Sequence, residues 1–179
     1  LFIAVKPYQV GAILDDIGAA VTNRHLVISI AAGVPLKFIE SILGRGRVVR
    51  VMPNMPCLIS AGMSVFTPGA RATTGDRRTV HRLLGSIGQA LELPESVFDS
   101  VTALSGSGPA FFAYLLDNMA DGAARRGLDR AIALRLAEQT MLGTAKLLME
   151  RCLDPRDLVA SVATPNGTTA AGLAVMEKH

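Results

Sequence analysis

Apolar residues in the first half of the chain occur in blocks that predict strands separated by helices. A continuous apolar run over 1–5 is typical of a strand buried on both faces of a parallel sheet, and the largely apolar segments 26–30 and 47–52 are the next predicted strands. Between these runs, apolar residues recur at helical spacing over 10–17 and 36–43. Strands that alternate with helices of about ten residues predict βαβ units. The first half is therefore predicted to be an α/β domain.

The pattern then completes this layer and changes to helices alone. We expect a strand near 63–66, a helix near 76–87 and a strand near 90–93, and from Ser96 onward the apolar spacing is helical. Residues that cap or begin helices mark the later helix starts: Ser107 or Gly108 before Pro109, Asp129, Asp154 before Pro155, and Thr168 with Thr169. We therefore place a domain boundary between residues 95 and 96.

Composition indicates a folded core and argues against several classes of protein. Of the 179 residues, 50% are apolar and 18% are charged, which is the opposite of a disordered chain. The longest uncharged stretch, residues 51–70, contains Pro53, Pro56 and Pro68, so we expect no membrane helix. The net charge of +3 is spread along a chain with 4% aromatic residues, so nucleic-acid binding is not expected.

The cysteines and histidines do not form a pattern of metal ligands. Cys57 and Cys152 lack the spacing of a metal site or a disulfide framework, so we expect a reducing, cytoplasmic location. We expect Cys152 to pack within a helix. The three histidines lie far along the chain from any cysteine or carboxylate cluster. Neither a metal site nor a catalytic triad is expected.

Three segments come directly after predicted parallel strands, where doubly wound sheets bind ligands. They are residues 4–7, 29–34 and 50–56. In the last segment, Pro53 and Pro56 hold an extended backbone, which suits an aromatic or amide ligand. Each segment is also explained by an ordinary turn or by tight packing. Both interpretations stay open on the pattern alone.

Other segments combine glycines, hydroxyls or positive charges. Residues 105–110 lack the Lys-Ser/Thr of a phosphate loop and the third glycine of a dinucleotide fingerprint, so we expect a closely packed helix start. Residues 164–169 place N–H groups and hydroxyls at a helix start, which suits a carboxylate or simple capping. For Arg45, Arg47 and Arg50 we expect solvated surface charge rather than a phosphate clamp.

Taken together, six segments resemble those of the pyrroline-5-carboxylate reductase family and follow the family's order. They are AVKP (4–7), SIAAGV (29–34), RVVRVMPNMP (47–56), ALSGSGPAF (103–111), ADGAARRGL (120–128) and ATPNGTT (163–169). One departure is that the family's Ser-Pro-Gly-Gly-Thr-Thr is here Thr-Pro-Asn-Gly-Thr-Thr. Asn166 tolerates a left-handed backbone, so we expect the loop to be kept.

The resemblance implies the C-terminal part of an α/β Rossmann-type domain over residues 1–95, followed by an all-α dimerisation and substrate-binding domain over 96–179. It implies an enzyme that reduces 1-pyrroline-5-carboxylate to L-proline, the last step of proline biosynthesis, with NADPH or NADH. It implies that the cofactor is bound by Ala4, Val5, Lys6, Pro7, Ala31, Ala32, Gly33, Met52, Pro53 and Asn54. It implies that the substrate is bound by Thr164, Gly167, Thr168 and Thr169, of which Thr169 is catalytic.

The resemblance also implies a homodimer formed through the helical domain, assembled into a ring of dimers. The helices expected over 109–126 and 130–151 carry more apolar surface than they can bury between them, so we expect them to intertwine with a second copy. Because the chain opens at Leu1 inside a predicted strand and ends within a helical pattern, we expect an internal fragment. It would lack the Gly-rich βαβ unit and bind NADPH poorly by itself.

Two other functions stay open at this point. A hydroxyacid dehydrogenase of similar build would use Lys146, in Gly143-Thr144-Ala145-Lys146, as its catalytic lysine. A non-catalytic helical oligomerisation module would need neither cofactor nor catalytic residue. Activity of a Lys146→Ala variant separates the first alternative from the reductase, and a turnover assay separates the second.

Overall fold

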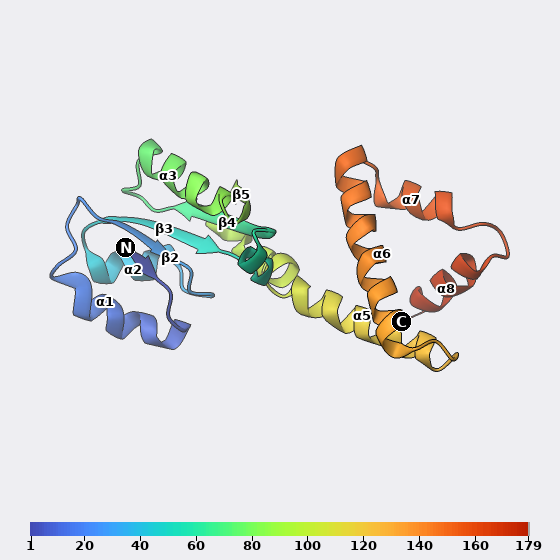
Figure 1. The fold of residues 1–179 in the computed structure, drawn as a ribbon. Helices are drawn as coiled ribbons and strands as arrows, with labels where there is room; N and C mark the ends of the chain where they lie inside the picture. Colours follow the sequence, from blue (N-terminus) through green and yellow to red (C-terminus); the bar gives the residue numbers. More distant parts are fainter. Residues whose placement is uncertain (179) are drawn as a thin grey trace. The chain divides into compact units, whose positions relative to one another are not determined.

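The computed structural model describes residues 1–178. Its contacts divide the chain into two compact units, Leu1–Phe112 and Ala113–His179. The first unit contains a five-stranded sheet with its covering helices, and the second is helical (Figure 1). The predicted change from an α/β pattern to helices alone is therefore confirmed. The predicted boundary after residue 95 stays a prediction.

The sheet has the strand order β1-β2-β3-β4-β5. Its strands are β1 (Phe2–Ile3), β2 (Leu26–Ser29), β3 (Arg47–Met52), β4 (Gly62–Pro68) and β5 (Gly88–Glu92). The pairs β1–β2, β2–β3 and β4–β5 are parallel, whereas β3 and β4 are antiparallel. The connection between β3 and β4 is shorter than the dozen or more residues that a parallel crossover needs, so β4 turns back along β3.

The helices match the predicted ones closely. In chain order they are α1 (Val10–Gly18), α2 (Leu36–Leu43), α3 (Thr74–Gly85), α4 (Phe98–Val101), α5 (Gly108–Ala124), α6 (Arg130–Arg151), α7 (Pro155–Val162) and α8 (Thr168–Met176). Short 3-10 turns lie at Pro7–Gln9, Met55–Ile59 and Glu95–Val97, and a π-helical segment, η4, lies at Thr102–Gly106.

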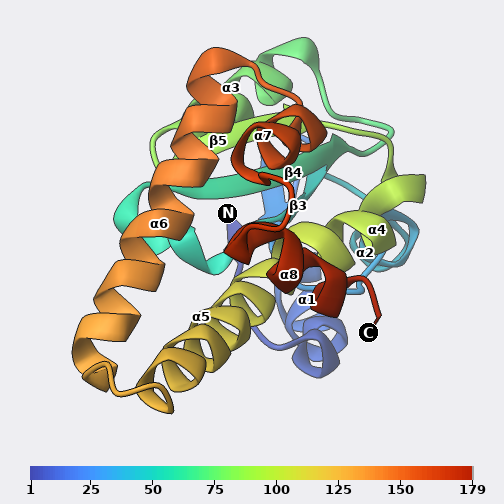
Figure 2. The same cartoon turned by 90° about the vertical axis from the view of Figure 1, so that its right-hand side faces the viewer.

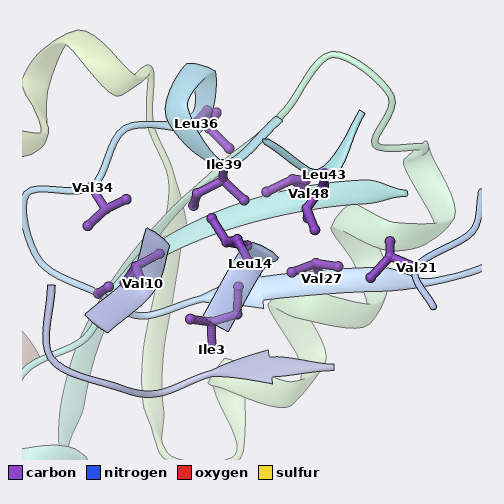
Figure 3. Close-up of a cluster of buried hydrophobic side chains, with 11 residues drawn as sticks. Ile3, Val10, Leu14, Val21, Val27, Val34, Leu36, Ile39, Leu43 and Val48 are labelled. Atoms are coloured by element: carbon purple, nitrogen blue, oxygen red, sulfur yellow. The ribbon is translucent and has the colours of Figure 1, made fainter. Parts of the chain in front are cut away.

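Two apolar clusters lie on opposite faces of the sheet. Helices α1 and α2 cover one face, where Leu14 and Ile39 pack against Val27 and Val48 (Figure 3). Helix α3 covers the other face, where Val80 and Leu84 pack with Val49, Val51 and Phe66. Neighbouring residues of one strand point to opposite faces, which explains why the apolar run of β3 supplies both clusters. This arrangement leaves the carboxyl ends of β1–β3 at one open edge.

Helices in the second unit begin where their capping residues predict. The Asp129 side chain accepts a hydrogen bond from Ile132 N at 3.0 Å, and that of Asp154 accepts one from Arg156 N at 2.7 Å. These bonds satisfy N–H groups that have no partner within a helix. Helices α6, α7 and α8 follow one another through short connections (Figure 2).

Three expectations about particular segments are wrong. The run over 1–5 forms a strand of only two residues, in which Ile3 is buried and Phe2 is 55% exposed, because β1 pairs with β2 alone. Arg47 and Arg50 are not solvated surface charges, since each forms an ion pair within the first unit. Cys152 does not pack within a helix: it is exposed and ends α6 with a φ of +49°.

In the described part of the chain, no helix has the length and apolar character needed to cross a bilayer. Over the same residues, no group of three or more His, Cys, Asp or Glu side chains is placed to hold a metal ion.

Candidate functional site

The carboxyl ends of β1 and β2 border a pocket of about 480 Å³. The pocket is lined by Ala4, Val5, Lys6, Pro7, Gln9, Ile30, Ala31 and Ala32. A backbone hydrogen bond of 3.1 Å from Ile30 N to Ile3 O holds the two strand ends side by side. The fold therefore brings residues 4–7 of the first predicted cofactor segment and residues 30–32 of the second into one pocket, whereas Gly33 lies outside its lining.

Two alanines after β2 line this pocket, and a left-handed glycine follows them. Ala31 is buried and Ala32 is exposed, and Gly33 follows with a φ of +73°. Only glycine adopts this conformation without strain. The backbone after β2 can therefore turn sharply at Gly33.

The third predicted segment, Met52–Asn54, lies at the end of the neighbouring strand β3. Asn54 has an extended backbone, with φ −127° and ψ 165°, but the extended backbone expected up to Pro56 is wrong, because a 3-10 turn begins at Met55. Its side-chain oxygen Oδ1 accepts a hydrogen bond from Met63 N at 2.8 Å. Its Nδ2 donates to Ser105 O at 3.3 Å and to Ser105 Oγ at 3.2 Å. The turn is thus tied to two other segments of the first unit.

The start of α2 is hydrogen-bonded to Glu95, a residue far along the chain. Glu95 Oε1 accepts from Leu36 N at 2.7 Å and from Arg50 Nη1 at 2.8 Å. The Arg50 side chain is 7% exposed and its guanidinium lies 4.7 Å from the centroid of the Phe98 ring, a cation–π distance. Arg50 therefore has a structural role: its side chain is occupied by Glu95 and Phe98.

The loop before α8 contains the predicted substrate-binding residues. Asn166 has a φ of +62°, which confirms that this asparagine adopts the left-handed conformation. Gly167 N donates to Thr164 O at 3.0 Å, and a Cβ on Gly167 would lie 2.5 Å from Thr164 Oγ1. The loop closes tightly on itself, so a larger residue at position 167 would require the Thr164 side chain to move.

The first turn of α8 leaves polar groups free. Its N-cap is Gly167, which offers no capping side chain, so the N–H groups of the first turn point out of the helix end. Among residues 1–178, the Thr169 hydroxyl is in no hydrogen bond, and the residue is half-buried. Thr169 is the second residue of the helix and is not its cap. The helix end is suited to an anion, with a hydroxyl donor beside it.

Several residues at the sheet edge were not predicted from the sequence. Ser105, Glu95 and Phe98 contact Asn54 or Arg50 across 45 or more residues of chain. One signal was available for Ser105: Pro109, four residues later, has no N–H to donate to its carbonyl. Nothing local in the sequence indicates the partners of Arg50. The binding roles of the predicted site residues stay predictions.

Comparison with known proteins agrees with this architecture. The family model for pyrroline-5-carboxylate reductase dimerisation matches residues 95–179. The chain is 45% identical to pyrroline-5-carboxylate reductase of Methanosarcina acetivorans, covering 99% of this chain and 66% of that protein. It is 41% identical to pyrroline-5-carboxylate reductase 3 of Rattus norvegicus, covering 98% of this chain and 64% of that protein.

Solved structures give the same result. The pyrroline carboxylate reductase of Plasmodium falciparum, a crystal structure with NADP bound, superposes with a TM-score of 0.93 and 30% identity over 99% of this chain and 71% of that one. The pyrroline-5-carboxylate reductase of Coxiella burnetii gives a TM-score of 0.89 and 30% identity, over 99% of this chain and 67% of that one.

The chain therefore falls in the class of Rossmann-type α/β proteins that continue into a helical dimerisation region. More specifically, it belongs to the pyrroline-5-carboxylate reductase family. It spans between 57% and 66% of the length of the curated relatives that it matches.

Proposed function

We propose that the whole protein reduces 1-pyrroline-5-carboxylate to L-proline with NADPH or NADH, as the last step of proline biosynthesis. Membership of the family supports this proposal. The observation that carries it is the start of α8, where uncapped N–H groups adjoin the hydroxyl of Thr169, which has no partner among the described residues. A carboxylate and an imine nitrogen on one small ring match these two kinds of donor.

The reduction adds a hydride to the imine carbon and a proton to the ring nitrogen. The nicotinamide cofactor supplies the hydride. The free N–H groups of Thr168 and Thr169 bind the substrate carboxylate at the positive end of the helix. The hydroxyl of Thr169 donates to the ring nitrogen and stabilises the charge that develops there as the neighbouring carbon is reduced. Gly167 keeps the loop narrow enough to present these donors together.

The edge of the sheet suits a dinucleotide. Its pocket of about 480 Å³ is lined in part by alanines and lies at the carboxyl ends of parallel strands, where doubly wound sheets bind such ligands. In this proposal Ala4, Val5, Lys6 and Pro7 contact the ribose and phosphates, with Ala31, Ala32 and Gly33 opposite. The Met52–Asn54 turn lies beside the nicotinamide, and Lys6 contributes an exposed positive charge.

The helical region supports a homodimer as the working form. Helices α5 and α6 expose large apolar side chains: Phe111, Phe112, Tyr114, Leu115, Met119, Ile132, Leu136, Leu142, Leu147 and Met149. An exposed apolar surface of this kind marks an association surface, and the matched family model is one of dimerisation. We extend the proposal to a ring of such dimers.

We also propose the extent of the two domains and the cellular location of the protein. Residues 1–95 belong to the cofactor-binding domain, and residues 96–179 to the dimerisation and substrate-binding domain. The protein acts in the cytoplasm, since Cys57 and Cys152 are both free thiols and such thiols persist in a reducing compartment.

A turnover assay tests the proposal. The whole protein is incubated with 1-pyrroline-5-carboxylate and either NADPH or NADH, while cofactor absorbance and proline formation are followed. We expect one proline for each cofactor consumed. Absence of turnover with both cofactors by a folded protein overturns the proposal. A Lys146→Ala variant that keeps full rate excludes the hydroxyacid-dehydrogenase mechanism, in which this exposed residue of α6 would be essential.

A further inference from the structure

The Asn54 side chain joins three segments at the edge of the sheet where the nicotinamide is proposed to lie. We infer that Asn54 is a positioning residue for hydride transfer, because its amide ties the Met52–Asn54 turn to Ser105 at the start of the helical region. The inference rests on the proposed function and deepens it. In this inference the side chain of Asn54 holds the turn in place, and the turn contacts the cofactor.

The orientation of the amide is determined by its partners. Met63 N is a donor and therefore faces Oδ1, at 2.8 Å. Ser105 O is an acceptor and therefore faces Nδ2, at 3.3 Å. No other arrangement of the amide satisfies both groups. Both ends of the side chain are thus engaged by protein groups, so Asn54 acts on a ligand through the turn that carries it.

The partner of Asn54 is a carbonyl that its own helix leaves free. In an α-helix, Ser105 O would accept from the N–H of residue 109, but that residue is Pro109, which has none. The chain passes this point as a π-helical segment, Thr102–Gly106, closed by a 2.9 Å bond from Ser107 N to Thr102 O. A π-helical segment is rare and frequently marks a functional site. Asn54 supplies the donor that Ser105 lacks.

A second contact joins the same two segments. A Cβ on Gly106 would lie 2.6 Å from Met52 Cε, so the methionine side chain rests directly on the glycine. Within the turn itself, Pro53 and Pro56 have no N–H groups with which to bind the backbone to its neighbours. Beyond the backbone pairing of Met52 with Val65 in the sheet, two side chains hold the turn to the π-helical segment. Met52 packs on it, and Asn54 is hydrogen-bonded to it.

The consequence for the reaction is geometric. Hydride transfer needs the two reacting carbons at close range, and a displacement of about 1 Å can cost a hundredfold in rate. A turn that is free to shift at the sheet edge would let the nicotinamide shift with it. The bridge from Asn54 to Ser105 restrains this motion from within the first unit.

The test replaces Asn54 by an apolar residue of similar size in the whole protein. Asn54→Leu removes all three hydrogen bonds of the side chain and adds no charge. Asn23→Leu is the matched control, at an exposed asparagine outside the proposed site. We expect kcat of Asn54→Leu to fall by about tenfold or more, with KM for NADPH within about twofold of the parent. The control is expected to keep the parent's kcat.

An isotope measurement separates positioning from loss of folded protein. With cofactor deuterated at the transferred position, we expect the isotope effect on kcat to rise in Asn54→Leu, because the hydride step has become slower. A fall in kcat of less than about threefold, or a larger fall with an unchanged isotope effect, overturns the inference.

A second variant decides the matter if Asn54→Leu does not fold. Asn54→Asp keeps an acceptor for Met63 N and removes the donor to Ser105. A lower kcat with a raised isotope effect supports the inference, and parent values of both overturn it. If the parent does not turn over 1-pyrroline-5-carboxylate, the proposed function fails and this inference fails with it. An active parent with an equally active Asn54→Leu overturns the inference alone.

Discussion

At the scale of single residues, the hydroxyl of Thr169 is available for the reaction because it does not cap its own helix. Gly167 is the N-cap of α8, and Thr169 stands two residues further on. A threonine that served only as a cap would accept a hydrogen bond from the first turn of its helix. Thr73 does so in α3, where its hydroxyl accepts from Asp76 N at 3.1 Å. The two threonines therefore offer a direct comparison between catalysis and capping.

We expect Thr169→Ala to lower kcat of the whole protein by about a hundredfold, since loss of a donor that acts in the transition state costs about 3 kcal/mol. Affinity for NADPH should stay near normal, and the melting temperature should change little. Steady-state kinetics, cofactor titration and a thermal melt measure the three quantities.

The control, Thr73→Ala, should show the reverse: about 1 kcal/mol less stability from the lost cap, with kcat unchanged. A kcat of Thr169→Ala within about threefold of the parent would mean that this hydroxyl takes no part in the reaction.

Ser64 presents a different single-residue effect. Its hydroxyl is buried in β4 and has no hydrogen-bond partner among the described residues. Replacing a buried hydroxyl that lacks a partner by a methyl group removes a desolvation cost. We expect Ser64→Ala to leave the free energy of unfolding unchanged or to raise it by up to about 1 kcal/mol, as measured by urea unfolding.

Ser29 is the matched control for Ser64. It is equally buried, but its Oγ accepts from Ala31 N at 3.4 Å. Ser29→Ala should therefore lower the free energy of unfolding. Equal losses of stability in the two alanine variants would contradict this account of Ser64.

At the scale of elements, the start of α3 is coupled to β3 through one carboxylate. Asp76 Oδ2 accepts from Thr73 N at 2.8 Å, from Thr73 Oγ1 at 2.7 Å and from Arg47 Nε at 2.8 Å. Burial opposes ionisation of Asp76, but these hydrogen bonds and the charge of Arg47 outweigh it and hold the pKa of Asp76 below its usual value. The Asp76 carboxylate thus belongs to the capping box of α3 and also pairs with Arg47 at the start of β3.

The lowered pKa predicts how stability depends on pH. A carboxylate with a depressed pKa in the folded state stabilises the protein above its unfolded pKa of about 4, and this contribution is lost as the pH falls through the folded value. We expect Asp76→Asn to lose about 2 kcal/mol at neutral pH and progressively less below about pH 4. Urea unfolding across pH measures the difference.

Asp15→Asn, at an exposed position of α1, is the control and should follow the parent at every pH. A difference between Asp76→Asn and the parent that stays constant from neutral pH to about pH 2 would rule out titration of Asp76 as the cause.

At the scale of the whole molecule, the apolar surface of α5 and α6 makes association the main expectation. Ile132 and Leu136 are 52% and 56% exposed, and both lie on the first turns of α6. A charge at the centre of such a surface cannot be buried in a dimer without a large desolvation cost. We expect Leu136→Glu to convert the dimer into a monomer in light scattering at micromolar concentration, with loss of turnover.

Leu83→Glu is the matched control because Leu83 is 43% exposed on α3 in the first unit. That variant should remain a dimer and stay active. A parent protein that is monomeric at micromolar concentration would contradict the dimer proposal directly.

Local patterns in the sequence determined most elements and their ends. Helix α2 and strand β3 have the predicted bounds, 36–43 and 47–52, because apolar periodicity, Pro35 and Gly44 act over a few residues. The caps Asp129 and Asp154 were predicted for the same reason. The resemblance to a family rested on short motifs, and their backbone conformations, such as the left-handed Asn166, are also local properties.

Only the tertiary structure decided which side chains meet at the sheet edge. Asn54 and Ser105 are 51 residues apart, and Arg50 and Glu95 are 45 apart. An arginine in a strand can be solvated or buried with a partner, and its sequence neighbourhood does not distinguish the two. The direction of β4 and the hydrogen bonds of Asn54 likewise depend on how segments that are distant in the sequence pack together. Hydrogen bonds and ion pairs of this kind form only between groups that the whole fold has already brought within reach.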